Sequence, residues 1–243
     1  MNRERELAKA FVDLSDTYAP EFDPLHLFHR LVHACKGLLQ VDAAAVMIAD
    51  ARGSLKTMAA TDEGAAFVEL LQTQTGHGPC MDCYRNGEAH GYPDITDEQE
   101  RWPRLVAAMT GSGYVALQTI PVRLHARQLG ALTLLRIRSG RLSEDDVHLA
   151  QSLADSSAVA LMHWSTEPAR SDDVITRVQS AIAAKATLEI AKGMIAEHAG
   201  VHVGDAGHLL TDYASRHRAS LARTVQALVT RDLEPAAILS MRT

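Results

Sequence analysis

Residues 41–60 read VDAAAVMIADARGSLKTMAA, and they contain two short apolar runs on either side of a polar turn. Val41 to Ala49 form an almost continuous run of small apolar residues, which Asp50-Ala51-Arg52-Gly53 closes. A second short run, Leu55 to Ala60, follows directly. Two such runs separated by a turn that contains Asp and Gly are typical of paired strands. The stretch therefore predicts a β-hairpin with its turn at residues 50–53.

Helices and further strands lie on either side of this hairpin. Residues 3–14 carry apolar residues at helical spacing, and a second helix is predicted to begin at Asp23-Pro24, with Asp23 as its N-cap. After the hairpin we expect helices over 63–73 and 102–109 and strands over 91–94, 114–122 and 128–137. Strands interleaved with helices on one side favour an α+β fold over a parallel βαβ repeat.

Composition limits the class of protein. Of the 243 residues, 47% are hydrophobic and 22% are charged, which excludes a disordered chain, a collagen-like repeat and a disulfide scaffold. The apolar runs fall short of the roughly 20 residues that span a bilayer, and the charged N-terminus has no apolar segment behind it. We therefore expect a cytoplasmic protein without a signal peptide, whose three cysteines are reduced thiols.

The chain is predicted to be helical throughout from Ser143 onward. Helices are expected over 143–164, 172–198, 204–217 and 220–232. From Val174 onward eight Lys or Arg face six Asp or Glu, whereas residues 1–173 have sixteen against twenty-four. This difference in charge indicates two parts with different partners. The helical region 146–195 is interpreted as a dimer connector that transmits a change of state from the first part of the chain to the C-terminal helices, with simple intramolecular packing as the alternative.

Two segments of the chain resemble known families. The first 165 residues resemble a GAF domain of the actinobacterial sensor type, and residues 174–233 resemble an ANTAR domain. The first resemblance rests on Val41–Met47, Gln72–Cys83, Arg85–Glu88, Trp102-Pro103 and Gly130–Leu132. The second rests on Leu188–Ile195, Ala206, Leu209-Leu210, Ala214 and Leu221.

These resemblances imply a domain order and a function. They imply a GAF sensor domain over 1–165, a linker over 166–173, an ANTAR RNA-binding domain over 174–233 and a tail over 234–243. The GAF part would be a six-stranded antiparallel sheet flanked by helices, followed by a coiled-coil connector and a three-helix ANTAR bundle. Such proteins resemble homodimeric transcription antiterminators that bind paired hairpins in nascent leader RNA, with the sensor domain controlling access to RNA.

Six basic residues of the C-terminal part are candidate RNA contacts. They are Lys185, Lys192, Arg216, His217, Arg218 and Arg223. The two lysines lie seven residues apart and so share one helix face, and the other four cluster at the junction of the last two helices. Positive side chains neutralise phosphates, and guanidinium planes stack on loop bases. The alternative is a solvated basic face without an RNA partner.

The residues His77, Cys80 and Cys83 form a candidate redox or ligand-pocket site. Two thiols three residues apart can form a redox pair, and His77 with His90 could complete a tetrahedral metal site. Pro79 indicates that a helix begins here, which would lower the pKa of Cys80. We favour a third interpretation, in which both thiols are structural and buried.

The loop Gly76-His77-Gly78-Pro79 has two interpretations. Its backbone N–H groups could cradle an anion, but it lacks the Lys and Ser/Thr of a P-loop, and we prefer a conformational hinge. In GAF relatives this region borders the ligand pocket, which implies a lid over a small-molecule effector. Nothing in the sequence names that ligand.

Enzyme motifs are missing from the sequence. There is no Gly-x-Ser-x-Gly elbow, no His-Glu-x-x-His and no Walker loop. His26, His29 and His33 share one helix face and could bind a metal, but we prefer to read them as the polar side of an amphipathic helix. We therefore predict no enzymatic activity, no catalytic residue and no metal site.

The sequence thus predicts a signal-responsive regulator that binds hairpins in leader RNA and opposes transcription termination, gated by the GAF domain. The expected partners are structured RNA, a second copy of the chain and a small-molecule effector, with no membrane. The alternative is a GAF sensor whose helical part binds proteins instead of RNA. Gly207, where ANTAR domains usually carry an aromatic residue, and the low charge balance of +2 from Val174 onward motivate it. The sequence also departs from the ANTAR pattern at Arg218, where Asn is common, and at Val225, where Ala is common.

Overall fold

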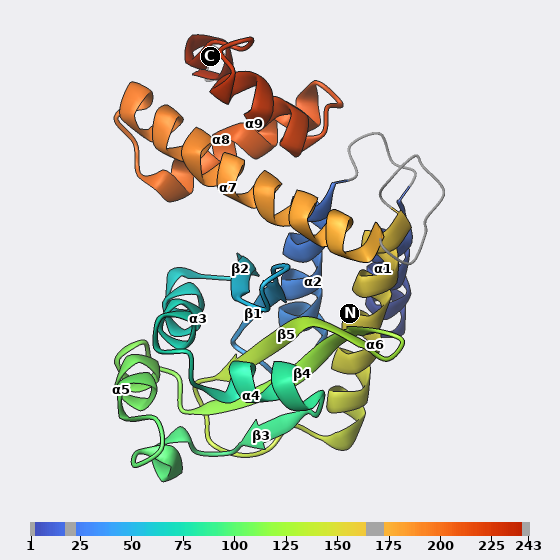
Figure 1. Ribbon diagram of the computed structural model, residues 1–243, viewed down its shortest axis with the longest axis vertical. Coiled ribbons are helices and arrows are strands. Elements are labelled where there is room, and N and C mark those ends of the chain that lie inside the picture. Colours follow the sequence, from blue (N-terminus) through green and yellow to red (C-terminus); the bar gives the residue numbers. More distant parts are fainter. Residues whose placement is uncertain (1–2, 18–22, 164–172, 240–243) are drawn as a thin grey trace.

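The computed structural model describes residues 3–17, 23–163 and 173–239 (Figure 1). Its strands are β1 (Ala43–Ala49), β2 (Leu55–Ala60), β3 (His90–Tyr92), β4 (Ala116–Leu124) and β5 (Arg127–Arg136). The helices of the first part are α1 (Arg3–Ser15), α2 (Pro24–Leu38), α3 (Glu63–Thr75), α4 (Pro79–Asn86), α5 (Pro103–Gly111) and α6 (Glu144–His163), with a short 3-10 helix at Ile95–Glu98. The helices of the second part are α7 (Asp173–Ala199), α8 (Val203–Arg216), α9 (Leu221–Val229) and α10 (Pro235–Leu239).

The described strands form one antiparallel sheet in the order β2-β1-β5-β4-β3. The predicted hairpin is confirmed: Ala45 lies opposite Ala60 and Ala49 opposite Leu55. The α+β class is confirmed as well, because every pairing in the sheet is antiparallel. The sheet has five strands in the described part of the chain, so the six strands implied by the family resemblance are wrong by one.

Gly130 permits the close approach of the two central strands. It lies on β5 directly opposite Ile48 of β1. A Cβ atom at this position would overlap the carbonyl oxygen of Met47 and press on the backbone of Ile48. Backbone atoms of a central strand cannot move aside as a side chain can. Only glycine therefore fits at this point of the sheet.

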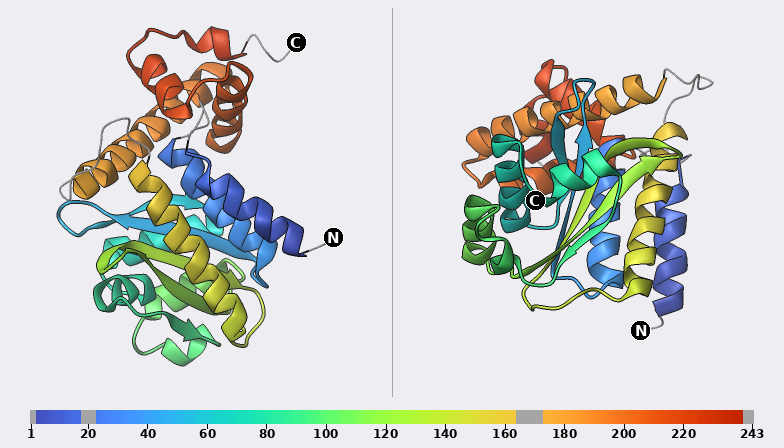
Figure 2. Two further views of the ribbon diagram at one scale, coloured as in Figure 1. Left: turned by 90° about the vertical axis from the view of Figure 1, so that its right-hand side faces the viewer. Right: turned by 60° about the horizontal axis from the view of Figure 1, so that its bottom comes forward.

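Helices cover both faces of the sheet, which corrects the prediction of helices on one side (Figures 1 and 2). α1, α2 and α6 pack together on one face, and α3, α4 and α5 lie on the other. All seven residues of β1 are buried, so this strand needs apolar cover on both sides. A sheet that carried helices on one face alone would leave half of β1 in water.

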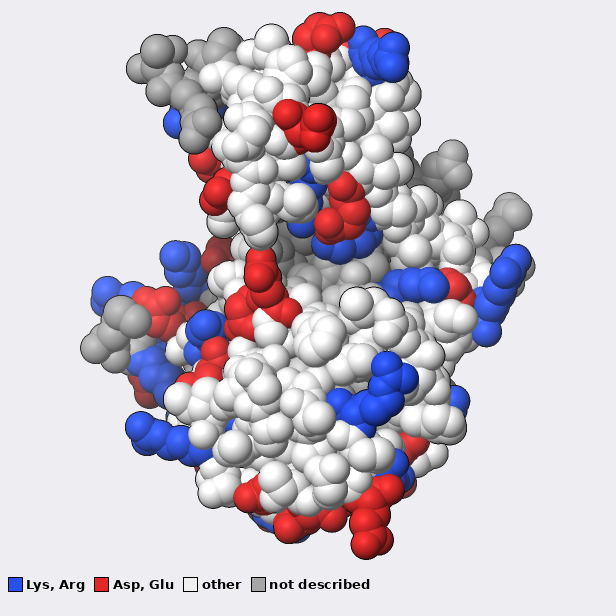
Figure 3. Space-filling view, turned by 90° about the vertical axis from the view of Figure 1, so that its left-hand side faces the viewer, with Lys and Arg blue, Asp and Glu red and all other residues white. Residues whose placement is uncertain are grey.

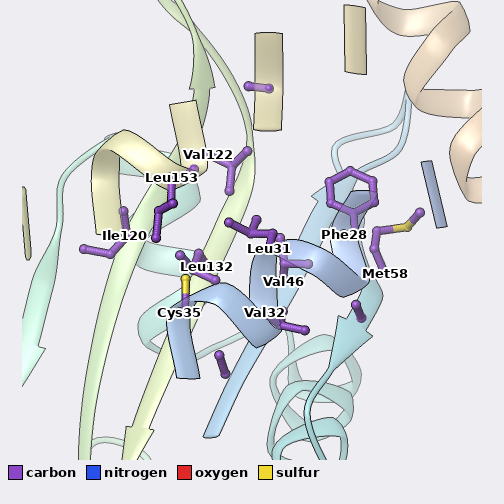
Figure 4. Close-up of a cluster of buried hydrophobic side chains, with 14 of the residues drawn as sticks. Phe28, Leu31, Val32, Cys35, Val46, Met58, Ile120, Val122, Leu132 and Leu153 are labelled. Atoms are coloured by element: carbon purple, nitrogen blue, oxygen red, sulfur yellow. The ribbon is translucent and has the colours of Figure 1, made fainter. Parts of the chain in front are cut away.

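The larger core lies between the sheet and the helices α2 and α6 (Figure 4). α2 contributes Phe28, Leu31, Val32 and Cys35 to it, at the three- and four-residue spacing of one helix face. The sheet contributes alternate residues of its strands, among them Val46, Ile120, Val122 and Leu132. The residues at helical spacing on α2 and the alternate residues of the strands thus pack together in one core cluster.

The second part of the chain is a helical bundle with its own core, and we call it the C-terminal bundle (α7 to α10). α7 packs against α8 and α9, and the core includes Leu188, Ile195, Leu210, Val225 and Ile238. Ile238 belongs to α10, a short helix within the predicted tail 234–243. The predicted linker 166–173 lies outside the described residues except for its last position.

The predicted connector region 146–195 consists of two separate helices with intramolecular partners. α6 packs along β4 and against α1 and α2, and it buries Ala150, Leu153, Ala154, Ala158 and Leu161 in the core under the sheet. α7 packs on α8, α9 and α2, and its first half adds Val178 and Ala181 to the core under the sheet. The coiled coil and the dimer stay predictions. None of the described helices combines the length and apolarity that crossing a membrane requires.

Helix α2 joins the two parts of the molecule. Its N-cap Asp23 is fully buried and accepts hydrogen bonds from the backbone N–H of Leu25 and His26 at 2.8 and 3.0 Å. The other carboxylate oxygen accepts a hydrogen bond from the N–H of Ala222 in α9 at 3.1 Å. Leu25 enters the core of the C-terminal bundle. One side chain therefore caps two helices from different parts of the chain.

Candidate functional site

A polar cluster lies buried between the sheet and the helices α3 and α4. Glu69 and Gln72 of α3, Cys80 of α4 and Thr133 of β5 are its members, and each is at most 1% exposed. α3 is fixed at its start by Asp62, which accepts hydrogen bonds from Ala65 N–H at 2.9 Å and from the Tyr114 hydroxyl at 2.8 Å. The cluster occupies the side of the sheet opposite to α2.

The loop between α3 and α4 is a tight turn that depends on glycine. Gly76 ends α3 in the left-handed conformation, and Gly78 has a φ of 145° with no room for a Cβ beside the Gln72 side chain. Gln72 Oε1 accepts the backbone N–H of Cys80 at 2.9 Å. Gly78 precedes α4 but has no side chain that could cap it. The side chain of Gln72, on the neighbouring helix α3, therefore accepts the hydrogen bond of this N–H at the start of α4. That N–H is thus already paired.

The Cys80 thiol is the centre of the polar cluster. Its sulfur lies 2.7 Å from Thr133 Oγ1, 3.5 Å from Glu69 Oε1 and 3.3 Å from Gln72 Nε2, which donates to it. Gln72 Nε2 also lies 3.3 Å from Glu69 Oε2. Every polar group in the cluster has a partner, as burial requires. The arrangement locks the two helices onto the sheet.

Cys83 lies one helical turn beyond Cys80 and meets a second threonine. Thr119 of β4 stands directly opposite Thr133 of β5, and its hydroxyl interacts with the Cys83 thiol. The two cysteines of α4 therefore lie over a cross-strand pair of buried threonines. His77 is exposed in the loop. Within the described residues, no three His, Cys, Asp or Glu side chains come together as a metal site would need.

The predicted lowering of the Cys80 pKa is wrong. A helix does begin at Pro79, but the Cys80 thiol is fully buried, and burial raises its pKa far above the ordinary value, assisted by the charge of Glu69. Burial likewise raises the pKa of Cys83 to about 12. The weak field of a helix end does not offset the loss of water around a thiolate. All three cysteines are free thiols, and this environment favours a structural role.

Glu69 is the residue that sequence reasoning missed. Burial raises its pKa from 4.5 to about 7, although hydrogen bonds from Thr133 and Cys80 oppose the shift. A carboxyl group in this state exchanges a proton near neutral pH inside the core. The signal was present in the sequence, because Ala65, Glu69 and Gln72 share the face of α3 that also carries the apolar Val68.

Lys185 and Lys192 share one face of α7, as their spacing predicts. Their ammonium groups meet on a single oxygen, Glu189 Oε1, at 2.6 and 3.0 Å. The lysines hold the pKa of Glu189 below its ordinary value, against an opposing effect of partial burial. Both lysines line a groove between α7 and α2 instead of an open outer surface. The structure therefore separates their surroundings from those of the other four predicted RNA contacts.

Those four residues are exposed around the junction of α8 and α9. Arg216 ends α8, His217 stacks on Tyr213 with ring centroids 4.1 Å apart, and Arg218 adopts a φ of 51° in the turn. Arg223 follows in the first turn of α9. Within the described residues none of the three guanidinium groups forms an ion pair. The junction thus presents unpaired donors beside a histidine–tyrosine stack.

Comparisons with known proteins concern the first part of the chain. A family model described as the GAF domain matches residues 23–161. The solved GAF domain of a Coxiella burnetii phosphoenolpyruvate-protein phosphotransferase is 19% identical with a TM-score of 0.52, over 67% of this chain and 94% of that one. The corresponding Acinetobacter domain is 12% identical with a TM-score of 0.51, over 75% and 97%. These similarities show the fold. None of the curated proteins matches the chain.

Proposed function

The chain belongs to the GAF domain family, and we propose that it is a signal-responsive regulator whose C-terminal bundle binds structured RNA. In this proposal the bundle holds hairpins of a nascent leader and opposes transcription termination, and the GAF domain controls its access to RNA. The RNA-binding and antitermination parts of this proposal come from the resemblance of residues 174–233 to an ANTAR domain. The chain would act as a homodimer, without a reaction of its own.

The observation that carries the proposal is the exposed junction of α8 and α9. Arg216, Arg218 and Arg223 offer three guanidinium groups with no ion pair inside the described part of the chain. Guanidinium groups bind phosphates through paired N–H donors and stack on unpaired bases. The stacked rings of Tyr213 and His217 add a flat surface at the same place. A surface of this kind suits the loop of an RNA hairpin.

The test is binding of the full chain to a pool of RNAs that each form two hairpins, at about 50 and about 200 mM salt. Each phosphate contact contributes roughly one unit to the slope of log affinity against log salt. The variant R216A/R218A/R223A should bind more weakly and with a slope shallower by up to about three units.

A matched control carries the same change of charge elsewhere. We call the first part of the chain, with β1 to β5 and α1 to α6, the sheet domain. Its exposed residues Arg52, Arg104 and Arg138 form no ion pairs with described residues, so R52A/R104A/R138A should keep the wild-type affinity and slope. If both triple variants lose affinity equally, binding reflects overall charge and the junction is not the site. If the wild-type chain binds none of the RNAs at either salt concentration, RNA binding is refuted.

A second candidate function, protein association through the C-terminal bundle, also has an observation in its favour. Ile190 on α7 is 55% exposed and Val203 at the start of α8 is 44% exposed. Exposed apolar side chains on a helical bundle are candidates for contact with a partner protein. In that case an Ile190→Gln substitution would alter association between proteins and leave RNA affinity at its wild-type value.

A further inference from the structure

A groove of about 310 Å³ separates the sheet domain from the C-terminal bundle. One wall is formed by α2 and the end of β2, and the other by α7 and α8. Figure 3 shows the hollow at the waist of the molecule, with basic and acidic side chains gathered along its upper edge. The volume falls at the lower end of the range for small-molecule sites. A molecule bound here would touch both parts of the chain at once.

The lining of this groove is rich in groups that can carry positive charge. They are His26, His29 and His33 of α2, Lys185 and Lys192 of α7, and His208 of α8. The lining includes no Asp or Glu. A neighbouring groove of about 280 Å³ between α1 and α2 differs, because Glu6 and Asp13 line it. The two neighbouring grooves therefore differ in the charge of the side chains that line them.

His29 shows how these charges converge. Its ring stacks on that of His33 with centroids 4.1 Å apart. Partial burial lowers the pKa of His29 to about 4, and the positive charges of His33, His26, His208 and Lys185 add to the effect. These charges come from α2, α7 and α8. His29 thus stands in a positive field that is offset in part by Glu189, which pairs with both lysines, and by Asp23, whose carboxylate lies 3.8 Å from His26 Nδ1.

Glu189 shows what the two lysines can hold. It lies beside the groove, is exposed, and brings both ammonium groups to one of its oxygens at 2.6 and 3.0 Å. The lysines therefore already converge on an oxyanion. A phosphate group has a higher charge and more acceptor oxygens than a carboxylate, so it would be a stronger partner at the same point.

Two glycines of α8 give the groove its space. Gly204 and Gly207 line it, and a Cβ on Gly207 would come within 3.0 Å of Lys192 Cε. Glycine in a helix interior costs about 1 kcal/mol relative to alanine. Here that cost leaves room for Lys192 and for whatever the lysine binds. Gly207 is the position at which the sequence departs from the aromatic residue usual in ANTAR domains.

We propose that this groove binds the phosphate group of a small organic molecule, with Lys185 and Lys192 as its principal partners and His208 and the α2 histidines around it. The ligand displaces Glu189 from the lysines and bridges α2 to α7 and α8. Because it contacts both parts, it stabilises their docked arrangement by an amount that grows with ligand concentration. This site is independent of the α8–α9 junction, and its existence does not require RNA binding.

The test is titration of the full chain with glycerol 3-phosphate at constant ionic strength, followed by calorimetry and by the imidazole signals of His29. We expect saturable binding of one ligand per chain and a rise in the pKa of His29. The variant K185Q/K192Q should bind about tenfold or more weakly, because two charge-assisted hydrogen bonds are lost. The control K36Q/K56Q removes two exposed lysines outside the groove and should bind as the wild type does.

Two further variants separate binding from stability. Glu189→Gln removes the internal competitor and should tighten binding severalfold. Gly207→Ala should melt no lower than the wild type, since alanine favours a helix, yet bind more weakly because it crowds Lys192. If the lysines had only a structural role, Glu189→Gln would not tighten binding while Gly207→Ala weakens it.

Three outcomes overturn the proposal. The first is binding that does not saturate or that K185Q/K192Q and K36Q/K56Q weaken equally. The second is binding to vesicles containing phosphatidylinositol phosphate but not to glycerol 3-phosphate, which would assign the groove to a lipid headgroup. The third is loss of RNA affinity in K185Q/K192Q with glycerol 3-phosphate binding intact, which would assign the lysines to RNA.

Discussion

Replacing Glu69 with Gln should remove a large part of the pH dependence of stability. An exposed glutamate has a pKa of 4.5, whereas burial in the folded protein raises the pKa of Glu69 to about 7. Between these pH values the folded chain holds a proton that the unfolded chain has released. The free energy of unfolding therefore falls as the pH rises through this window. The difference of about 2.5 pKa units corresponds to about 3 kcal/mol over the whole window.

Glutamine has nearly the same shape and no charge, so E69Q avoids the cost of a buried carboxylate. Its amide can accept from Gln72 and donate to Thr133, which keeps the cluster paired. The free energy of unfolding of E69Q minus that of the wild type should rise by up to about 3 kcal/mol from pH 4.5 to pH 8. Urea unfolding at each pH, followed by circular dichroism, gives both values.

An exposed control and a refuting result complete this test. Glu100 is exposed, and E100Q should show a difference from the wild type that stays flat with pH. If the E69Q difference is equally flat, or falls as the pH rises, Glu69 does not hold a raised pKa. The account of the buried cluster would then be wrong.

Three further predictions follow from single contacts. Asp23→Ala should lower the free energy of unfolding by about 2 kcal/mol or more, because this buried carboxylate caps two helices; chemical denaturation measures the change. Gly130→Ala should leave little folded protein, since its Cβ would overlap the Met47 carbonyl; solubility and circular dichroism would show it, and a wild-type melting curve would contradict the packing. Cys80 and Cys83 should react with a thiol reagent only as fast as the chain opens, and immediate labelling of the native protein would refute their burial.

Local sequence patterns predicted the secondary structure well where they are compatible with only one type of element. The start of α2 at Asp23-Pro24 is confirmed, because an N-cap followed by proline specifies a helix start without help from distant residues. The hairpin over 41–60 is confirmed for a similar reason. The strand expected over 114–122 begins two residues later, at Ala116, and continues to Leu124. Ends of strands depend on partners that local sequence does not name.

Features that depend on distant contacts could not be predicted. Glu69 reads as an ordinary helical acid until α4 and β5 cover it, and the environment of Cys80 changes for the same reason. Lys185 and Lys192 share a helix face in the sequence, but only the docking of α2 shows that this face lines a groove. The same docking places the histidines of α2 in the lining of this groove. A one-dimensional pattern carries no information on which surface will face another.

The proposed function is tested most directly by transcription through a leader that contains a terminator, in the presence of the purified full chain. We expect the protein to raise the fraction of transcripts that pass the terminator. The variant R216A/R218A/R223A should lose this effect, and R52A/R104A/R138A should keep it. If readthrough stays at its basal level with saturating protein on every leader of the two-hairpin pool, the C-terminal bundle does not oppose termination, and the central claim is contradicted.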